Sequence, residues 1–67
     1  MQLIDKAWTP QQNKYMNTWQ ADTKAEVTAD FDPEGAVGSA IVVIEEGAVY
    51  LKNSAGKWQK YGTTEVI

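Results

Sequence analysis

The chain is 67 residues long, carries six basic and nine acidic residues for a formal charge of -3, and contains neither cysteine nor histidine. A chain of this length forms at most one domain, which buries only about 60% of the surface that its unfolded chain exposes. The missing residue types exclude disulfide bonds, the usual structural zinc sites and Ser-His or Cys-His catalytic pairs. The negative charge disfavours nucleic acid and anionic lipid as partners. We therefore expect a non-enzymatic domain without cofactor or metal, and without a nucleic-acid or membrane partner.

Residues 1–12 predict an arm rather than a core element, because the segment is short and irregular yet carries Leu3, Ile4 and Trp8. Apolar side chains of this kind often anchor interfaces. We therefore divide the chain into an N-terminal arm and a single small β-rich domain at residues 13–67. The start lacks the pattern of a signal peptide, and no apolar run approaches the roughly 20 residues that span a bilayer.

The segment after the arm fits either a helix or a strand. Residues 9–12, Thr-Pro-Gln-Gln, offer a threonine cap, a proline at the first helical position and a capping-box glutamine. Residues 15–20 are instead typical of a strand, with Tyr15 and Trp19 on one side and Thr18 on the other. We favour the strand, so the expected fold is mainly β, with a small α+β fold as the alternative.

A short helical turn and a loop are expected next. Residues 23–26, Thr-Lys-Ala-Glu, form a second capping-box pattern, which predicts a helical turn that reaches Thr28 and ends before residues 31–33, Phe-Asp-Pro. The glycine, aspartate and proline content of residues 30–39 predicts a loop.

An acidic stretch within this loop imitates the opening of an EF-hand calcium loop. It has acids at positions one, three and five and glycine at position six, in the residues Asp30, Asp32, Glu34 and Gly35. Position twelve requires a bidentate glutamate, and this sequence has Ile41 there. We therefore interpret the stretch as a solvated acidic turn.

The C-terminal half predicts a three-stranded antiparallel meander. Apolar runs occupy residues 40–45, 48–52 and 57–61, and turn-forming residues separate them at 46–47 and 53–56. With the strand favoured above, the domain becomes an antiparallel meander of three to four strands with a short helical turn.

Both faces of this meander are expected to be apolar. A two-residue loop at 46–47 places Val42, Ile44, Val49 and Leu51 on one face and Ile41, Val43 and Tyr50 on the other. A chain of 67 residues offers little material to cover both faces, so we expect another chain to cover one of them. The face of Trp58 stays open: a three-residue second loop puts it with Tyr50, and a two- or four-residue loop puts it with Leu51.

The apolar excess divides between core and interface. The usual burial ranking favours an ordinary core for about two thirds of these residues and an interface for the rest. The sequence offers no candidate catalytic, cofactor-binding or metal-ligating residue. The candidate interface residues are Leu3, Ile4, Trp8, Ile41, Val43 and Tyr50.

The block from Val37 to Tyr61 resembles a unit found in small virion proteins of tailed phages. The shared features are a GS-A-x-V start, a VYxLN- or LYV-like strand and a G-x-W turn, and Gly38, Tyr50, Gly56 and Trp58 are the firmest points of likeness. Similar units occur in head fibre proteins and tail-fibre segments, and the resemblance covers residues 13 to 61.

The resemblance implies a virion structural protein, made in the cytoplasm of a host bacterium, that decorates the capsid or anchors a fibre. Its implied partners are the major capsid protein or another virion protein and copies of itself, for example in a trimer. Fibre proteins continue into long shaft regions after such a unit, whereas this sequence stops at Ile67, which favours capsid decoration. We expect attachment through the N-terminal arm and the exposed sheet edge.

Two other functions remain as alternatives. One is a small soluble regulatory protein that binds a host or phage protein through the acidic surface around Asp30, Asp32 and Glu34. The other is carbohydrate binding through exposed tryptophan and tyrosine side chains.

Overall fold

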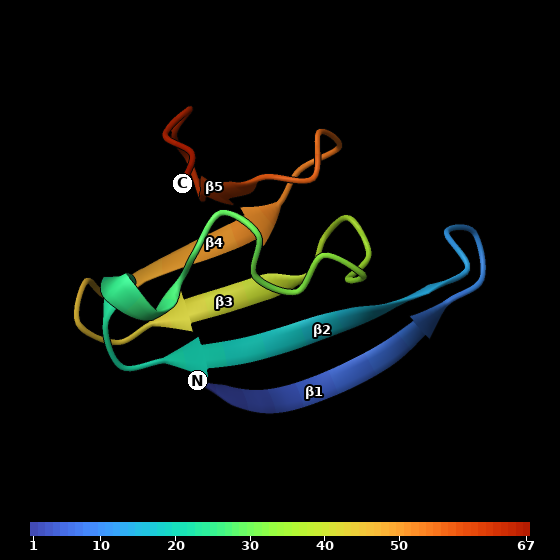
Figure 1. The fold of residues 1–67 in the computed structure, drawn as a ribbon, viewed down its shortest axis with the longest axis horizontal. Coiled ribbons are helices and arrows are strands. Elements are labelled where there is room, and N and C mark those ends of the chain that lie inside the picture. Colours follow the sequence, from blue (N-terminus) through green and yellow to red (C-terminus); the bar gives the residue numbers. More distant parts are fainter.

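Five strands lie side by side in chain order and form one sheet in the computed structural model, which describes residues 1–67 (Figure 1). The strands are β1 (Gln2–Thr9), β2 (Lys14–Ala21), β3 (Ala40–Val43), β4 (Ala48–Lys52) and β5 (Trp58–Lys60), and the 3-10 helix η1 (Lys24–Glu26) lies between β2 and β3. The predicted mainly β fold is confirmed, with five strands instead of three or four. The structure contains no helix long and apolar enough to cross a membrane.

Neighbouring strands are antiparallel except for β2 and β3, which run parallel. The meander β3-β4-β5 is therefore confirmed, but the all-antiparallel sheet is wrong. Parallel strands need a connection that returns the chain to the same end of the sheet. Residues 22–39, which we call the crossover segment, make that return and lie over one face of the sheet (Figure 1). The predicted helical turn and loop both lie in this segment.

The strand favoured for residues 15–20 is confirmed by β2, whereas residues 1–12 are not an arm separate from the domain. They form the edge strand β1 and the turn that joins it to β2. The pairing register shifts between Leu3 and Asp5, so Ile4 is the extra residue of a β-bulge. The bulge breaks the two-residue alternation, which is why the sequence of this strand looked irregular.

The loops of the meander explain how its faces are arranged. The first loop has four residues, 44–47, so Ile44 lies in the loop and not on the strand face predicted for it. The faces predicted for the other residues are preserved, because two- and four-residue loops have the same parity. The second loop has five residues, 53–57, which pairs Trp58 with Lys52 and puts the indole on the Tyr50 face. Asn53 closes this loop, since its side-chain Oδ1 accepts hydrogen bonds from the backbone amides of Ala55 and Lys57.

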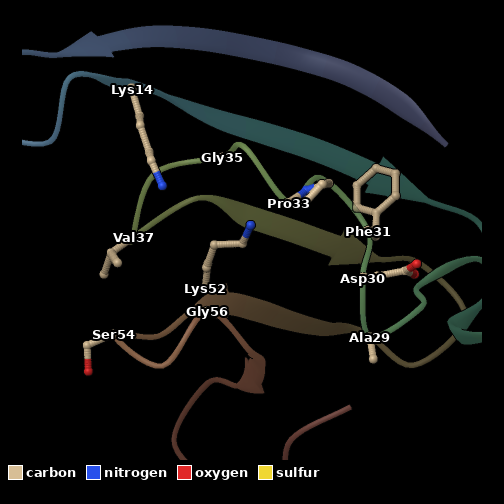
Figure 2. A pocket seen from close by; sticks show the side chains of 10 residues that line it. All are labelled: Lys14, Ala29, Asp30, Phe31, Pro33, Gly35, Val37, Lys52, Ser54 and Gly56. Atoms are coloured by element: carbon tan, nitrogen blue, oxygen red, sulfur yellow. The ribbon is translucent and has the colours of Figure 1, made fainter.

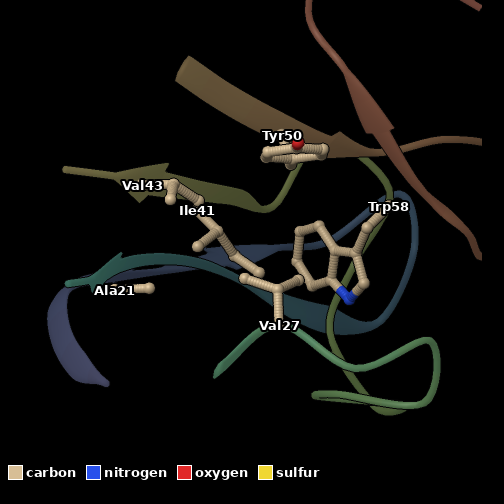
Figure 3. Close-up of a cluster of buried hydrophobic side chains, with 6 residues drawn as sticks. All are labelled: Ala21, Val27, Ile41, Val43, Tyr50 and Trp58. Atoms are coloured by element: carbon tan, nitrogen blue, oxygen red, sulfur yellow. The ribbon is translucent and has the colours of Figure 1, made fainter. Parts of the chain in front are cut away.

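The hydrophobic core lies between the crossover segment and one face of the sheet (Figure 3). Phe31 of the crossover segment packs between two indole rings, with ring centroids 4.9 Å from Trp19 and 6.3 Å from Trp58. The six buried residues of the core cluster are Ala21, Val27, Ile41, Val43, Tyr50 and Trp58.

The opposite face of the sheet carries no second layer of secondary structure. We call it the open face. The register places Met16, Thr18, Gln20, Ala40, Val42, Val49 and Leu51 of β2, β3 and β4 on it, and all seven are partly exposed. On β1, Asp5 and Ala7 share this face, because they pair with Thr18 and Met16. Alternate residues of β3 and β4 therefore face either a closed core or an uncovered surface.

Because the core lies on one side of the sheet, substitutions at neighbouring positions of a strand should lower the free energy of unfolding by very different amounts. Ile41→Ala removes a fully buried side chain and should lower the free energy of unfolding by about 2–5 kcal/mol. Val42→Ala, on the open face, should cost much less. Urea denaturation of dilute protein, followed by tryptophan fluorescence, measures both, and equal losses would contradict a core confined to one face.

Candidate functional site

Asp32 fixes the crossover segment to the sheet. Its carboxylate Oδ2 accepts hydrogen bonds from Asn17 Nδ2 at 3.0 Å and from Trp19 Nε1 at 3.1 Å, both on β2. Its backbone carbonyl accepts a hydrogen bond from Lys52 Nζ on β4. One residue thus binds two strands that enclose β3, and its φ of 51° lies in the left-handed region that aspartate tolerates better than most residues.

Gly35 provides the space that this arrangement needs. A Cβ atom at Gly35 would clash with the carboxylate of Asp32 and would lie 3.2 Å from Ser39 Oγ. Ser39 Oγ in turn accepts a hydrogen bond from the backbone amide of Asn17. A side chain at position 35 would therefore displace the Asp32 contacts on β2.

The acidic turn has a different structure from the one we expected. Asp32 is engaged with the sheet, and Thr28 Oγ1 donates a hydrogen bond to Asp30. No three carboxylates come close enough together to hold a metal ion. The expected acidic surface is thus reduced to Asp30 and Glu34, because Asp32 belongs to the core side of the loop.

A pocket of about 250 Å³ lies between the crossover segment and the β4–β5 loop (Figure 2). Lys52 lines it and is 4% exposed, with its ammonium 5.2 Å from the Trp58 ring centroid. Its hydrogen bond to the Asp32 carbonyl and this cation–π contact stabilise the buried charge. Lys52 therefore acts as a structural link between β4 and the crossover segment.

A second concavity, which we call the aromatic groove, lies where β1 and β2 extend beyond the crossover segment. It has a volume of about 340 Å³ and two hydrophobic lining residues, Trp8 and Tyr15. Their ring centroids are 5.0 Å apart in an edge-to-face arrangement, and the side chains are 51% and 43% exposed. The polar lining residues are Lys6, Asn13, Lys14, Asn17, Asp32 and Glu34.

A third concavity of about 280 Å³ lies beside the open face. Its hydrophobic lining residues are Leu51 and the exposed Val37 and Tyr61. This hollow extends the apolar surface of the open face toward β5.

The structure separates the six candidate interface residues into two groups. Ile41, Val43 and Tyr50 have fully buried side chains in the core cluster, so they are unavailable to a partner and are corrected from interface to core. Their burial follows from the crossover segment, which the local sequence pattern does not place. Leu3, Ile4 and Trp8 are exposed on β1, and their role in binding stays a prediction.

Sequence reasoning missed the aromatic groove because it treated residues 1–12 as an arm. The available sequence signal was Asn13, because asparagine tolerates positive φ better than most residues. In the structure Asn13 has a φ of 55° in the turn at residues 10–13. A hairpin closed there pairs Trp8 with Tyr15 and Lys6 with Asn17. The hydrogen bonds of Asp32 to Asn17 and Trp19 left no such signal in the sequence near Asp32.

Glu26 connects η1 to the start of β1. Its Oε1 lies 2.6 Å from the amino terminus of Met1, and its Oε2 accepts a hydrogen bond from the backbone amide of Thr23 at 2.9 Å. The ammonium and then this amide lower the pKa of Glu26 from 4.5 to about 2. The carboxylate also raises the pKa of the amino terminus. The predicted capping box at residues 23–26 is present in η1.

Comparison with protein-family models, curated proteins and solved structures finds no match to this chain.

Substitution of Asp32 should destabilise the fold. Asp32→Ala removes two hydrogen bonds to a charged acceptor and should cost about 2–4 kcal/mol. A domain of this size has about 3–10 kcal/mol of stability in total, so much of it would be lost. Asp30→Ala, a neighbouring exposed carboxylate, is the matched control and should change stability by about 0.5 kcal/mol or less. Urea denaturation compares the two, and similar losses would show that Asp32 does not fix the crossover segment.

The Glu26 contacts predict an acid-sensitive contribution to stability. Because the folded pKa lies below the unfolded value, the contribution is present above about pH 4.5 and is lost as the pH falls toward 2. The Tm of the wild type should therefore fall over that range by more than the Tm of Glu26→Gln, with exposed Glu34→Gln as the control. Parallel Tm profiles of wild type and Glu26→Gln, measured by circular dichroism, would contradict the assignment.

Proposed function

We propose that this chain is a non-enzymatic virion structural protein that attaches to a phage particle through its open face and associates there with copies of itself. The observation that carries the proposal is the uncharged, partly apolar surface that the open face presents on β2, β3 and β4, on a sheet with no second layer. Binding to a partner would bury this face and remove its apolar side chains from water.

The composition of the open face supports a docking role. The seven side chains that β2, β3 and β4 place on it are uncharged, although fifteen of the 67 residues in the chain are charged, and Asp5 lies on the same face only at the β1 edge. Depletion of charge is characteristic of the buried centre of protein interfaces. The adjacent hollow, lined in part by Val37 and Tyr61, adds exposed apolar surface. A protruding side chain of a partner would fill this hollow.

The strand edge is less suited to the attachment than the open face. β1 has charged residues, Asp5 and Lys6, at its centre and a bulge at Ile4. Charges and bulges are the features with which edge strands resist pairing with another strand. We therefore assign attachment to the side chains of the open face rather than to the edge, a revision of the expected attachment through an arm and an edge.

The resemblance to phage virion units is consistent with this assignment. The block at residues 37–61 contains β3, β4 and β5, the strands that carry Val42, Val49 and Leu51 on the open face. The implied partners are the major capsid protein or another virion protein, and a homo-oligomer such as a trimer.

Particle composition tests the proposal. Quantitative mass spectrometry of purified particles of the encoding phage should find this chain at a fixed ratio to the major capsid protein. A high ratio corresponds to capsid decoration, and a low fixed ratio to a vertex, neck or tail position. Absence from the particles would overturn the proposal and favour the regulatory alternative, in which Asp30→Lys with Glu34→Lys should weaken partner binding.

Variants of the open face test the attachment surface. Val42→Lys and Leu51→Lys place a charge where the partner would exclude water, so each should reduce the amount of chain on particles by about tenfold or more. Ala55→Lys adds the same charge at an exposed position in the β4–β5 loop and is the matched control. Circular dichroism of each variant verifies the fold. Normal attachment of folded Val42→Lys and Leu51→Lys would exclude the open face.

A further inference from the structure

The aromatic groove lies on the side of the sheet opposite to the open face and is not used by the proposed attachment. Trp8, Tyr15 and Asn17 of the groove lie on the covered side, since Trp8 pairs with Tyr15 and Asn17 alternates with the open-face residues Met16 and Thr18. A chain attached by its open face would thus present this groove to the surroundings. We propose that the aromatic groove binds a short, uncharged carbohydrate, with the exposed face of Trp8 as its stacking platform.

The lining of the groove combines aromatic and polar side chains. Trp8 and Tyr15 supply the apolar surface, and the other six lining residues are polar or charged, with no aliphatic residue among the eight. A pyranose ring has apolar C–H faces and a rim of hydroxyl groups. It therefore needs a flat aromatic surface together with planar amide and carboxylate groups around that surface. An aliphatic peptide side chain would gain little from such a polar rim.

The rings of Trp8 and Tyr15 are preorganised but still accessible. Lys6 Nζ lies 4.3 Å from the centroid of the Tyr15 ring, and Tyr15 supports Trp8 by its edge-to-face contact. These contacts hold the indole in place while about half of its surface stays exposed. A rigid, exposed tryptophan loses little entropy on binding, which is the property of an aromatic anchor.

Asn17, which lines the groove, has an unpaired side-chain acceptor. Asn17 is 8% exposed, and its Nδ2 is committed to Asp32 while its Oδ1 accepts no hydrogen bond. A buried polar atom without a partner is costly and rare in native proteins. Because Oδ1 is itself buried in this conformation, a sugar hydroxyl group in the groove would pair with it only after the Asn17 side chain moves.

Charge and size define the ligand further. Lys6 and Lys14 balance Asp32 and Glu34, so the formal charges of the lining cancel and favour a neutral ligand over an anionic one. The volume of about 340 Å³ lies at the lower end of the range of roughly 300–1,000 Å³ for small-molecule sites. The groove is therefore suited to one or two sugar units of a longer neutral chain.

Titration with defined sugars tests the proposal on the isolated chain, without particles. The probes are neutral trisaccharides of glucose, N-acetylglucosamine, galactose and mannose, each at millimolar concentration, with sialyllactose as an anionic control. Saturation-transfer NMR should show contact with at least one neutral trisaccharide, and tryptophan fluorescence should change during the same titration. Absence of both signals for all four neutral probes, or tighter binding of sialyllactose, would overturn the proposal.

Variants locate the site. Trp8→Ala should weaken binding by about tenfold or more, and Trp8→Tyr should restore part of the affinity because it keeps an aromatic face. Tyr61→Ala removes an exposed aromatic side chain outside the groove and should leave binding unchanged. Circular dichroism establishes that each variant is folded. Unchanged sugar binding in folded Trp8→Ala, or loss of binding in folded Tyr61→Ala, would contradict the assignment to the groove.

Discussion

The hydrogen bonds of Asp32 are the constraint on which the rest of the structure depends. Its side chain binds β2 through Asn17 and Trp19, and its carbonyl binds Lys52 on β4, so the crossover segment is held across β3. Local sequence does not bring β2 and β3 together, because residues 22–39 separate these two parallel strands along the chain. Phe31, the residue before Asp32, is thereby placed between the indole rings of Trp19 and Trp58. The polar contacts fix the position of the segment, and the aromatic contacts bury apolar area that a small chain needs.

A crossover segment on one side leaves the two faces of the sheet with different chemistry. The covered face contains the core and, where the crossover segment does not reach, the aromatic groove with Trp8. On β2, β3 and β4 the open face presents uncharged side chains, several of them apolar, with no layer of secondary structure above them. This asymmetry connects the two proposals, since attachment by one face leaves the groove on the other face accessible. It also accounts for the thin core, because a single covered face limits the area that this chain buries by itself.

Sequence predicted the features of the fold that depend on neighbouring residues. Turn residues such as Gly47 and Gly56, both at positive φ, located the loops of the meander, and alternation located β2 and the faces of β3 and β4. Features set by distant contacts could not be predicted. The bulge at Ile4 concealed β1, and nothing near Asp32 showed that its carboxylate meets Asn17 across fifteen residues. Trp8 is exposed and its role in binding stays a prediction, and the groove itself depends on the pairing of Trp8 with Tyr15.

Thiol labelling tests most directly whether the open face is uncovered in the free chain and covered on the particle. The chain has no native cysteine, so Val42→Cys introduces a single reactive group on that face. The account predicts that this thiol reacts readily with a maleimide in the free, folded protein and becomes strongly protected in purified particles. Ala55→Cys, in the exposed loop, should react in both states. Equal labelling of position 42 in the free and the particle-bound chain would contradict the account.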